Sequence, residues 1–218
     1  MDIPILLIYS GGLDSTVLLH FLKNEGDEVQ AISFSYGQKH SKEIQIAGEN
    51  CRDLNVPHEI LEIPMNRYFS GSLLQNGPEI PEGHYEDENM KQTVVPMRNL
   101  IFASIAAGYA SSHGISCIAL GVHSGDHAIY PDCRPEFISS LSETINLADW
   151  NHVEILTPFL HKKKDEIVKI GLDLKVDFSK TWTCYKGGEK PCGKCGSCTE
   201  RNEAFKKNGT LDPLSEYF

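Results

Sequence analysis

Blocks of hydrophobic and polar residues along the chain predict strands and helices in alternation. Residues 3–9 form a nearly continuous apolar run, as expected of a strand that is buried on both faces. Residues 15–24 then carry apolar side chains at helical spacing, and the pattern stops at Gly26. The same alternation predicts three further elements: a strand over residues 29–36, a helix over residues 39–54 and a strand over residues 58–63.

The alternation resumes after an irregular stretch. Residues 66–92 lose periodicity and collect Gly, Pro, Asn and acidic residues, and a loop of that length is usually functional or mobile. Residues 180–205 hold a cysteine cluster and end in a short helix. Between these stretches the pattern predicts a helix over residues 98–113, a strand over 116–122, a helix over 135–149, a strand over 153–158 and a helix over 164–171.

Strands and helices that alternate with long connections are typical of parallel sheets. We therefore predict an α/β fold: a doubly wound, mostly parallel five-stranded sheet with helices on both faces. The chain divides into an α/β domain over residues 1–180 and a small C-terminal four-cysteine module over residues 181–218. Ligands of such sheets bind at the carboxyl ends of the strands, near the point where the strand order reverses.

The composition fits one globular domain: of 218 residues, 40% are hydrophobic and 23% are charged. No apolar run approaches the roughly 20 residues that cross a bilayer, and the N-terminus lacks the basic segment of a signal peptide. The net charge of −10 argues against a nucleic-acid partner and favours a small-molecule substrate, because proteins that bind nucleic acid show a clustered positive face. We predict a cytoplasmic protein without a membrane partner.

The first predicted turn, Ser10-Gly11-Gly12-Leu13-Asp14-Ser15, carries the clearest chemistry. Backbone N–H groups and the positive end of the following helix converge there, and the paired glycines let a phosphate approach closely. Asp14 would repel a bare phosphate, so we predict that it holds Mg²⁺ bridging the phosphates. The alternative is an ordinary strand-to-helix turn with an Asp/Ser cap.

Four of the seven cysteines lie close together, at Cys184, Cys192, Cys195 and Cys198. Two consecutive Cys-x-x-Cys turns with interposed glycines suit a tetrahedral site of four thiolates. We favour structural Zn²⁺, because four thiolates leave no open coordination position. An iron–sulfur cluster uses similar spacing and is the main competitor, and four free thiols are the remaining alternative. The other three cysteines are expected to fill space in the core.

A polar string, which contains Tyr36, Gln38 and His40, follows the second predicted strand. An aromatic ring, an amide and an imidazole at a strand end can stack on a base and read its edge. The alternative is a glycine turn with polar caps.

Two further strings carry cations at the expected ligand edge. Arg98 opens a helix at the end where the helix dipole disfavours a cation, which indicates a phosphate or carboxylate partner. Asp132 and Arg134 belong to a polar stretch beyond the fourth predicted strand. One prediction is that these two residues contact substrate. The alternative is that the stretch is solvated and Asp132 caps the next helix.

The hexapeptide at residues 10–15 resembles the Ser-Gly-Gly-x-Asp-Ser signature of PP-loop ATPases, which activate a carboxylate or amide oxygen by adenylation. This resemblance implies that ATP binds with Mg²⁺ at the end of the first strand. The ATP-binding residues that it implies are Tyr9, Ser10, Gly11, Gly12, Leu13, Asp14, Ser15 and Thr16.

Several strings together are similar to the 7-cyano-7-deazaguanine synthase family, in the same order from about residue 9 to about residue 205. They are Tyr-Gly-Gln-x-His from Tyr36, Val-Pro-x-Arg-Asn ending at Asn99, Tyr-Pro-Asp-Cys-Arg ending at Arg134, and Thr-Trp-Thr-Cys-Tyr ending at Tyr185. The resemblance implies an ATP-dependent ligase that converts 7-carboxy-7-deazaguanine and ammonia into 7-cyano-7-deazaguanine, the precursor of queuosine and archaeosine. The acid is adenylated, ammonia gives an amide, and a second activation removes the amide oxygen.

The resemblance also implies roles for particular residues. Asp14, Arg98 and Lys164 are the implied catalytic residues, the four clustered cysteines bind zinc, and the protein forms a homodimer. The implied substrate-binding residues are Tyr36, Gln38, His40, Arg98, Asp132 and Arg134.

Two positions depart from the family pattern: Met97 stands where many members have Gly, and Ala128-Ile129 where many have Ser-Gly. They leave open a second enzyme hypothesis, a ligase that joins the activated acid to a protein or another macromolecular amine. A nucleic-acid-binding zinc module is a third hypothesis. A different PP-loop synthetase is disfavoured, because no glutaminase segment fits within 218 residues. PP-loop geometry predicts AMP and pyrophosphate as products, rather than ADP and phosphate.

Overall fold

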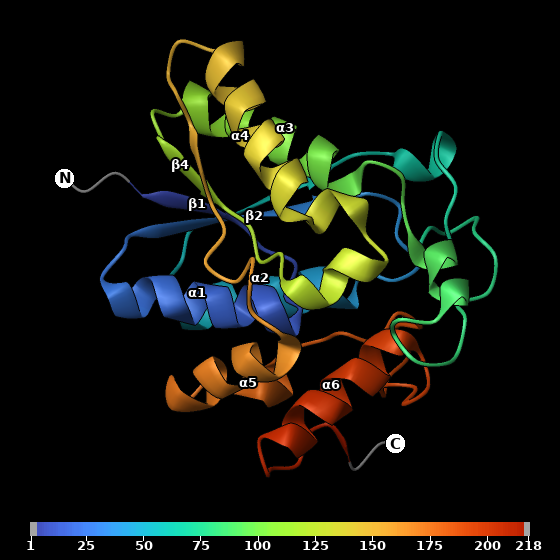
Figure 1. The fold of residues 1–218 in the computed structure, drawn as a ribbon. Helices are drawn as coiled ribbons and strands as arrows, with labels where there is room; N and C mark the ends of the chain where they lie inside the picture. Colours follow the sequence, from blue (N-terminus) through green and yellow to red (C-terminus); the bar gives the residue numbers. More distant parts are fainter. Residues whose placement is uncertain (1–3, 216–218) are drawn as a thin grey trace.

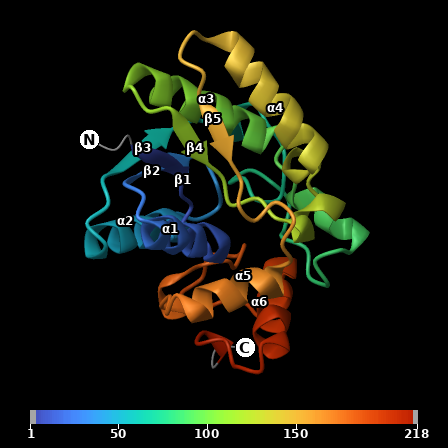
Figure 2. The ribbon, with the colours of Figure 1, turned by 60° about the vertical axis from the view of Figure 1, so that its left-hand side comes forward.

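The computed structural model describes residues 4–215 of the chain. Five parallel strands form one sheet in the order β3-β2-β1-β4-β5 (Figures 1 and 2). Their bounds are β1 Ile5–Ile8, β2 Val29–Ser35, β3 His58–Glu62, β4 Cys117–Ala119 and β5 Glu154–Leu156. The predicted five-stranded α/β fold is confirmed, and the predicted start of the first strand at Ile3 lies outside the described residues.

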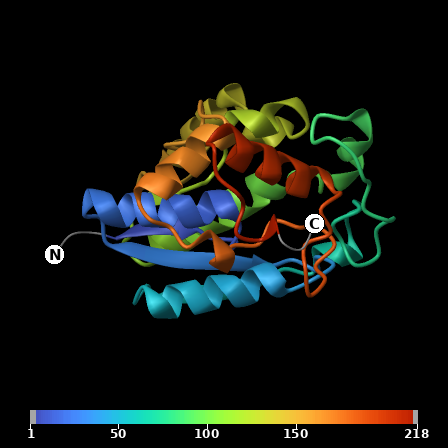
Figure 3. The same ribbon diagram turned by 90° about the horizontal axis from the view of Figure 1, so that it is seen from below.

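Helices cover both faces of the sheet (Figures 1 and 3). Helices α3 and α4 pack on one face, α1, α2 and α5 lie on the other, and α6 packs against α5. Their bounds are α1 Leu13–Glu25, α2 Lys42–Asp53, α3 Arg98–Ser112, α4 Pro135–Ala148, α5 Lys164–Asp173 and α6 Gly196–Lys207. Within residues 4–215, no helix has the length and apolar character that a membrane span needs.

The sheet separates two hydrophobic cores, because successive side chains of a strand point to opposite faces. In β1, Leu6 packs in the core on the α3 side and Leu7 in the core on the α1 side, and both are fully buried. Ala103 and Ala106 of α3 belong to the first core, and their small side chains let that helix lie close to the sheet. The central strand is therefore buried on both faces, as its continuous apolar run predicts.

The irregular stretch and the cysteine segment both join the core on the α3 side. Residues 66–92 contribute buried side chains such as Leu74 and Tyr85, and Met65–Arg67 and Glu88–Thr93 are short 3₁₀ helices. The cysteine segment contributes Trp182 to the same core. The stretch that lacks periodicity is therefore packed, and the division of the chain at residue 180 stays a prediction.

The predicted strand over residues 116–122 ends earlier than the apolar pattern suggests. Only Cys117–Ala119 is paired as a strand, although the N–H of Leu120 still donates to Leu156 O at 3.0 Å. Leu120, Gly121 and Val122 then line a cavity. Apolar residues that face a binding cavity and apolar residues of a buried strand give the same hydrophobic pattern.

Met97 precedes α3 in a left-handed backbone conformation, with φ of 57° and ψ of 22°, and its side chain is 61% exposed. A side chain at such angles brings Cβ against the following carbonyl group, whereas glycine does not. We expect Met97→Gly to raise the free energy of unfolding by about 0.5–1 kcal/mol, after the greater chain entropy of unfolded glycine is subtracted. Urea denaturation measures the change. Met97→Ala is the control: it keeps Cβ and should bring no gain, and a destabilised glycine variant would contradict the strain argument.

Candidate functional site

A cavity of about 230 Å³ lies at the carboxyl ends of β1, β2 and β4. The strand order reverses between β1 and β4, and this is the place where ligands bind in open parallel sheets. Walls of the cavity come from the loop after β1, the segment after β2, the start of α3 and the cysteine segment. Residues that are far apart in the sequence therefore meet here.

The loop after β1 has the form of an anion site. Ser10 Oγ accepts the N–H of Gly12 at 3.1 Å and lies 3.0 Å from Ser15 Oγ. Gly11 has φ of 82°, and a Cβ there would lie 2.3 Å from the carbonyl oxygen of Glu43 on α2. Only glycine fits that position without displacing α2. The first turn of α1 follows directly, so the positive end of its dipole faces the cavity.

Tyr9 and Thr16 support this loop from behind. The Tyr9 hydroxyl accepts a hydrogen bond from Asn50 Nδ2 at 2.9 Å and lies 3.2 Å from Thr16 Oγ1, which donates to Gly12 O at 2.8 Å. Burial raises the pKa of Tyr9 to about 12, so its phenol is neutral. Of the eight residues expected at ATP, Gly11 and Thr16 do not line the cavity, and the other six do.

Asp14 and Lys164 form a buried ion pair at the phosphate end of the cavity. Lys164 Nζ donates to both Asp14 oxygens, at 2.8 and 2.7 Å, and lies 3.3 Å from Glu200 Oε2. Burial acts to raise the pKa of Asp14, but the nearby charges of Lys164 and His123 outweigh it, and the pKa is lowered. Burial raises the pKa of Glu200. Two carboxylates thus share one cation, and their oxygens are the type of ligand that Mg²⁺ takes.

His123 lies between the Asp14–Lys164 pair and a further carboxylate, that of Asp126. It is 1% exposed, and its Nε2 lies 3.7 Å from Asp14 Oδ2 and 3.5 Å from Asp126 Oδ2. Because Nδ1 accepts the N–H of Gly125 at 3.1 Å, a neutral ring carries its proton on Nε2. The Tyr85 hydroxyl donates to Asp126 Oδ1 at 2.5 Å. A continuous polar network therefore runs from the phosphate end to Tyr85.

Three tyrosines from separate parts of the chain form the far end of the cavity: Tyr85, Tyr130 and Tyr185. The Tyr130 hydroxyl lies 2.6 Å from Thr93 Oγ1 and 3.3 Å from the Tyr185 hydroxyl. Burial raises the pKa of all three phenols, so they stay neutral and can donate hydrogen bonds. This end of the cavity suits a planar polar molecule.

Arg98 lines the cavity from the first residue of α3. Its guanidinium lies 5.9 Å from the centre of the Tyr130 ring. Burial opposes the charge, but Tyr36, Tyr130 and Asp132 around it more than offset burial and raise the pKa of Arg98. A permanent cation is therefore held in the cavity wall beside Tyr130.

Asp132 lies behind Arg98 and does not line the cavity. Its Oδ2 accepts the backbone N–H of Asn99 at 2.9 Å, and Asn99 Nδ2 donates to Asp132 O at 3.2 Å. Asp132 therefore caps α3, the helix that carries Arg98, and not the following helix that the alternative named. It holds Arg98 in place from outside the wall.

Of the remaining substrate-binding residues expected from the sequence, Tyr36 and Gln38 line the cavity, whereas His40 and Arg134 do not. Gln38 Oε1 accepts the N–H of Tyr36 at 2.8 Å. His40 packs under Gly187, where a Cβ would lie 2.1 Å from the imidazole ring. Arg134 Nε donates to His127 O at 2.8 Å, just before α4.

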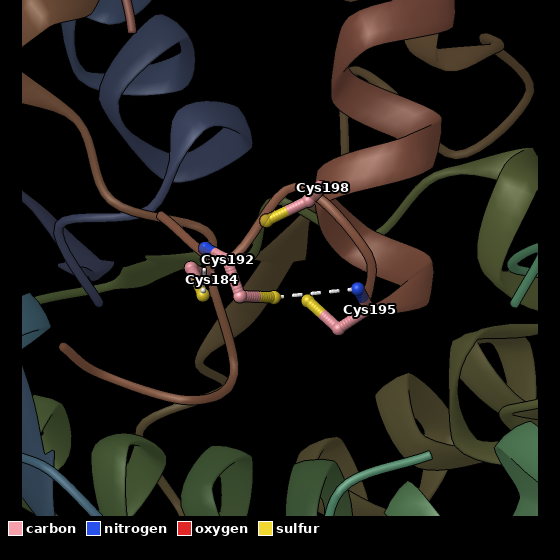
Figure 4. A group of neighbouring side chains, drawn as sticks. All are labelled: Cys184, Cys192, Cys195 and Cys198. Carbon is pink, nitrogen blue, oxygen red and sulfur yellow. Dashed lines mark hydrogen bonds between the residues drawn. The ribbon is translucent and has the colours of Figure 1, made fainter. Parts of the chain in front are cut away.

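The four clustered cysteines gather at one point, with all four sulfur atoms within 4.8 Å of one another (Figure 4). A tetrahedral zinc site with Zn–S bonds of about 2.3 Å has sulfur–sulfur distances of about 3.8 Å. Backbone N–H groups of Cys192 and Cys195 donate to the sulfurs of Cys184 and Cys192, at 3.3 and 3.4 Å. None of the four forms a disulfide. The donor set and its spacing fit a metal ion.

The cysteine cluster adjoins the cavity wall. Trp182 donates its backbone N–H to Gly11 O at 3.1 Å and its Nε1–H to Cys184 O at 2.9 Å. Tyr185 follows the first cysteine directly, and a Cβ at Gly196 would lie 3.1 Å from Cα of Tyr85. The cluster therefore fixes two of the three tyrosines and touches the loop after β1.

A family model described as "Queuosine biosynthesis protein QueC" matches residues 4–209. The chain belongs to this family. The synthase-family resemblance seen in the sequence is thus confirmed over nearly the full length. Curated relatives at about 50% identity are named as synthases, so the protein is an enzyme.

Curated relatives share about half of their residues with the chain. A 7-cyano-7-deazaguanine synthase of Hahella chejuensis is 53% identical over 209 residues, covering 95% of this chain and 90% of that protein. A 7-cyano-7-deazaguanine synthase of Caldicellulosiruptor saccharolyticus is 52% identical over 209 residues, covering 95% of this chain and 93% of that protein.

Among solved structures, the fold is similar to that of a predicted subunit of tRNA methyltransferase from Methanocaldococcus jannaschii. The TM-score is 0.52 and the identity 15%, and the match covers 99% of this chain and 92% of that chain. At this identity the likeness concerns the fold alone.

Proposed function

We propose that this QueC family member converts 7-carboxy-7-deazaguanine, ammonia and ATP into 7-cyano-7-deazaguanine, as an ATP-dependent ligase. The observation that carries the proposal is one cavity with an anion-binding loop and an Asp14–Lys164 pair at one end and Arg98 with three tyrosines at the other. The curated relatives bear the name of this synthase. Their similarity spans all the strings that line the cavity.

The cavity suits two successive activations of one carbon. The loop at residues 10–15 would hold the phosphates of ATP, with the α-phosphorus facing the carboxylate of the deazapurine. Mg²⁺ held by Asp14 would neutralise the pyrophosphate leaving group. Lys164 and Arg98 would stabilise negative charge that develops at the reacting oxygens, and the neutral tyrosines would orient the base. Ammonia then displaces AMP to give the amide, and a second adenylation removes the amide oxygen.

We further propose that the four cysteines bind Zn²⁺ in a structural role. Support comes from the four-thiolate donor set, which leaves no open coordination position. The enzyme would act in the cytosol, because a cluster of four cysteines without disulfides is typical of a reducing compartment. Homodimer formation stays a prediction.

The alternative acceptor, a macromolecular amine, has no support in the cavity. It was suggested by Met97 and by Ala128-Ile129, where the family pattern differs. Met97 is 61% exposed and Ile129 is 6% exposed within the core, and neither lines the cavity. These departures therefore give no reason for a different acceptor.

Incubation of the purified chain with ATP, Mg²⁺, the deazapurine acid and ¹⁵N-ammonium tests the proposal. We expect ¹⁵N-labelled nitrile by mass spectrometry, with AMP and pyrophosphate formed at each activation. Omission of ammonium should stop the reaction at the adenylate and serves as the control. Turnover of ATP without amide or nitrile would contradict the proposal, and ADP in place of AMP would contradict the adenylation step.

A further inference from the structure

In the part of the chain that the structure describes, four carboxylates line the cavity: Asp14, Glu43, Asp126 and Glu200. Three of them already have ion-pair or hydrogen-bond partners. Asp14 and Glu200 share the cation of Lys164, and Asp126 accepts the hydroxyl of Tyr85 at 2.5 Å. Of these four cavity carboxylates within residues 4–215, only Glu43 has neither a hydrogen bond nor an ion pair to its side chain.

Glu43 is held firmly in place by its backbone. It lies in the first turn of α2, and its backbone carbonyl oxygen lies 2.3 Å from the position that a Cβ on Gly11 would take. Glu43 therefore sits directly beside the loop that carries the predicted phosphate site. The charged and titratable groups that act on its carboxyl come from three other elements: Arg98 of α3, Tyr36 after β2 and Cys184 of the cysteine segment.

The proposed reaction requires a base near this loop. When ammonia displaces AMP from the acyl adenylate, a C–N bond forms, the C–O bond to AMP breaks, and the new nitrogen must lose a proton. When the amide oxygen attacks ATP, pyrophosphate leaves and a second N–H proton must go. Loss of AMP from that adduct, with loss of the last N–H proton, gives the nitrile. Each proton leaves the nitrogen that is bonded to the carbon carrying the activated oxygen.

We propose that Glu43 is the general base that takes these nitrogen protons. The inference rests on the proposed function and adds a catalytic residue to it. A carboxylate without a partner, fixed beside the phosphate loop, can accept a proton without losing an ion pair or a hydrogen bond. Asp14 and Glu200 would lose the ion pair with Lys164, and Asp126 would lose the hydrogen bond from Tyr85. The proton passes from Glu43 to solvent through the open cavity between steps.

The pKa of the Glu43 carboxyl group agrees with this role. Burial raises the pKa of Glu43 to about 7, although the charge of Arg98 acts in the opposite direction. A general base works best when its pKa lies near the working pH, because it is then both available and basic enough.

Glu43→Gln tests the role, since it keeps the shape and removes the base. We expect the rates of amide and nitrile formation to fall by about 10²-fold or more. The KM for the acid, and acid-dependent exchange of pyrophosphate into ATP without ammonium, should stay within about threefold. In the wild type, kcat should rise with pH through about 7 as the carboxyl loses its proton. That rise should be absent in Glu43→Gln.

Glu49→Gln is the matched control, because Glu49 lies on the exposed side of the same helix. It should retain wild-type rates. Glu43→Asp should retain the pH dependence at a reduced rate, and it carries the same test if the glutamine variant does not fold.

Two results would overturn the inference. One is nitrile formation by Glu43→Gln within about fivefold of the wild type. The other is a parallel loss of pyrophosphate exchange, which would assign Glu43 to ATP or acid binding. Failure of the proposed function is distinguishable, because the wild type itself would then form no amide or nitrile.

Discussion

Replacement of Asp14 by asparagine is expected to lower kcat/KM for nitrile formation by at least about 10³-fold. Asparagine keeps the shape but removes the charge that Lys164 Nζ contacts at 2.7 and 2.8 Å. Removal of one group that stabilises developing charge in an active site typically lowers kcat by about 10²–10³-fold, and Asp14 also holds the cation of Lys164 in place. The variant also loses the proposed Mg²⁺ ligand, so excess Mg²⁺ should restore little activity.

The assay that checks this is pyrophosphate exchange, which isolates the first adenylation. Asp14→Asn should lose exchange and nitrile formation together, unlike the Glu43 variant. Asp27→Asn, at an exposed position after α1, is the charge-matched control and should behave as the wild type. If Asp14→Asn exchanged pyrophosphate at the normal rate, Asp14 would have no role at the phosphates.

The fold was predictable because its signals are local. A run such as residues 5–8, buried on both faces, and helices with apolar stripes need only a few neighbouring residues to be recognised. The turn at residues 10–15 was predictable for the same reason, since its serine contacts lie within the turn itself. Strand ends were less predictable, because Leu120 and Val122 are apolar for the cavity rather than for the sheet.

The cavity was only partly predictable, because much of its wall depends on long-range contacts. Tyr85 lies in a stretch without periodicity, and its place against Gly196 and Asp126 follows from the way that stretch packs. Glu200 carries no local signal, since it meets Lys164 only when α6 packs on α5. Conversely, His40 and Arg134 stand next to lining residues in sequence, but they lie behind the wall. Residues that are close in sequence therefore need not face the same side of the cavity wall.

Replacement of Cys198 by serine is expected to release the proposed Zn²⁺ and to lower the free energy of unfolding by at least about 4 kcal/mol. Cys198 is 1% exposed at the start of α6, and its sulfur is one of four that meet within 4.8 Å. Without the metal, three buried thiols keep no common partner, and the segment from Trp182 to Gly196 loses the cross-link that holds it. Elemental analysis for metal content and urea denaturation measure the two effects.

The same variant separates a structural metal from one that acts in the reaction. Since Tyr185 follows Cys184 and Tyr85 packs on Gly196, loss of the metal should raise the KM for the deazapurine acid more than that for ATP. The phosphate loop is held largely by its own serines, which the metal does not touch. Cys117→Ser, in β4 and outside the cluster, is the control and should keep its metal. Full metal content and stability in Cys198→Ser would exclude the four-cysteine site, whereas iron with a visible absorption band in the wild type would identify an iron–sulfur cluster in place of zinc.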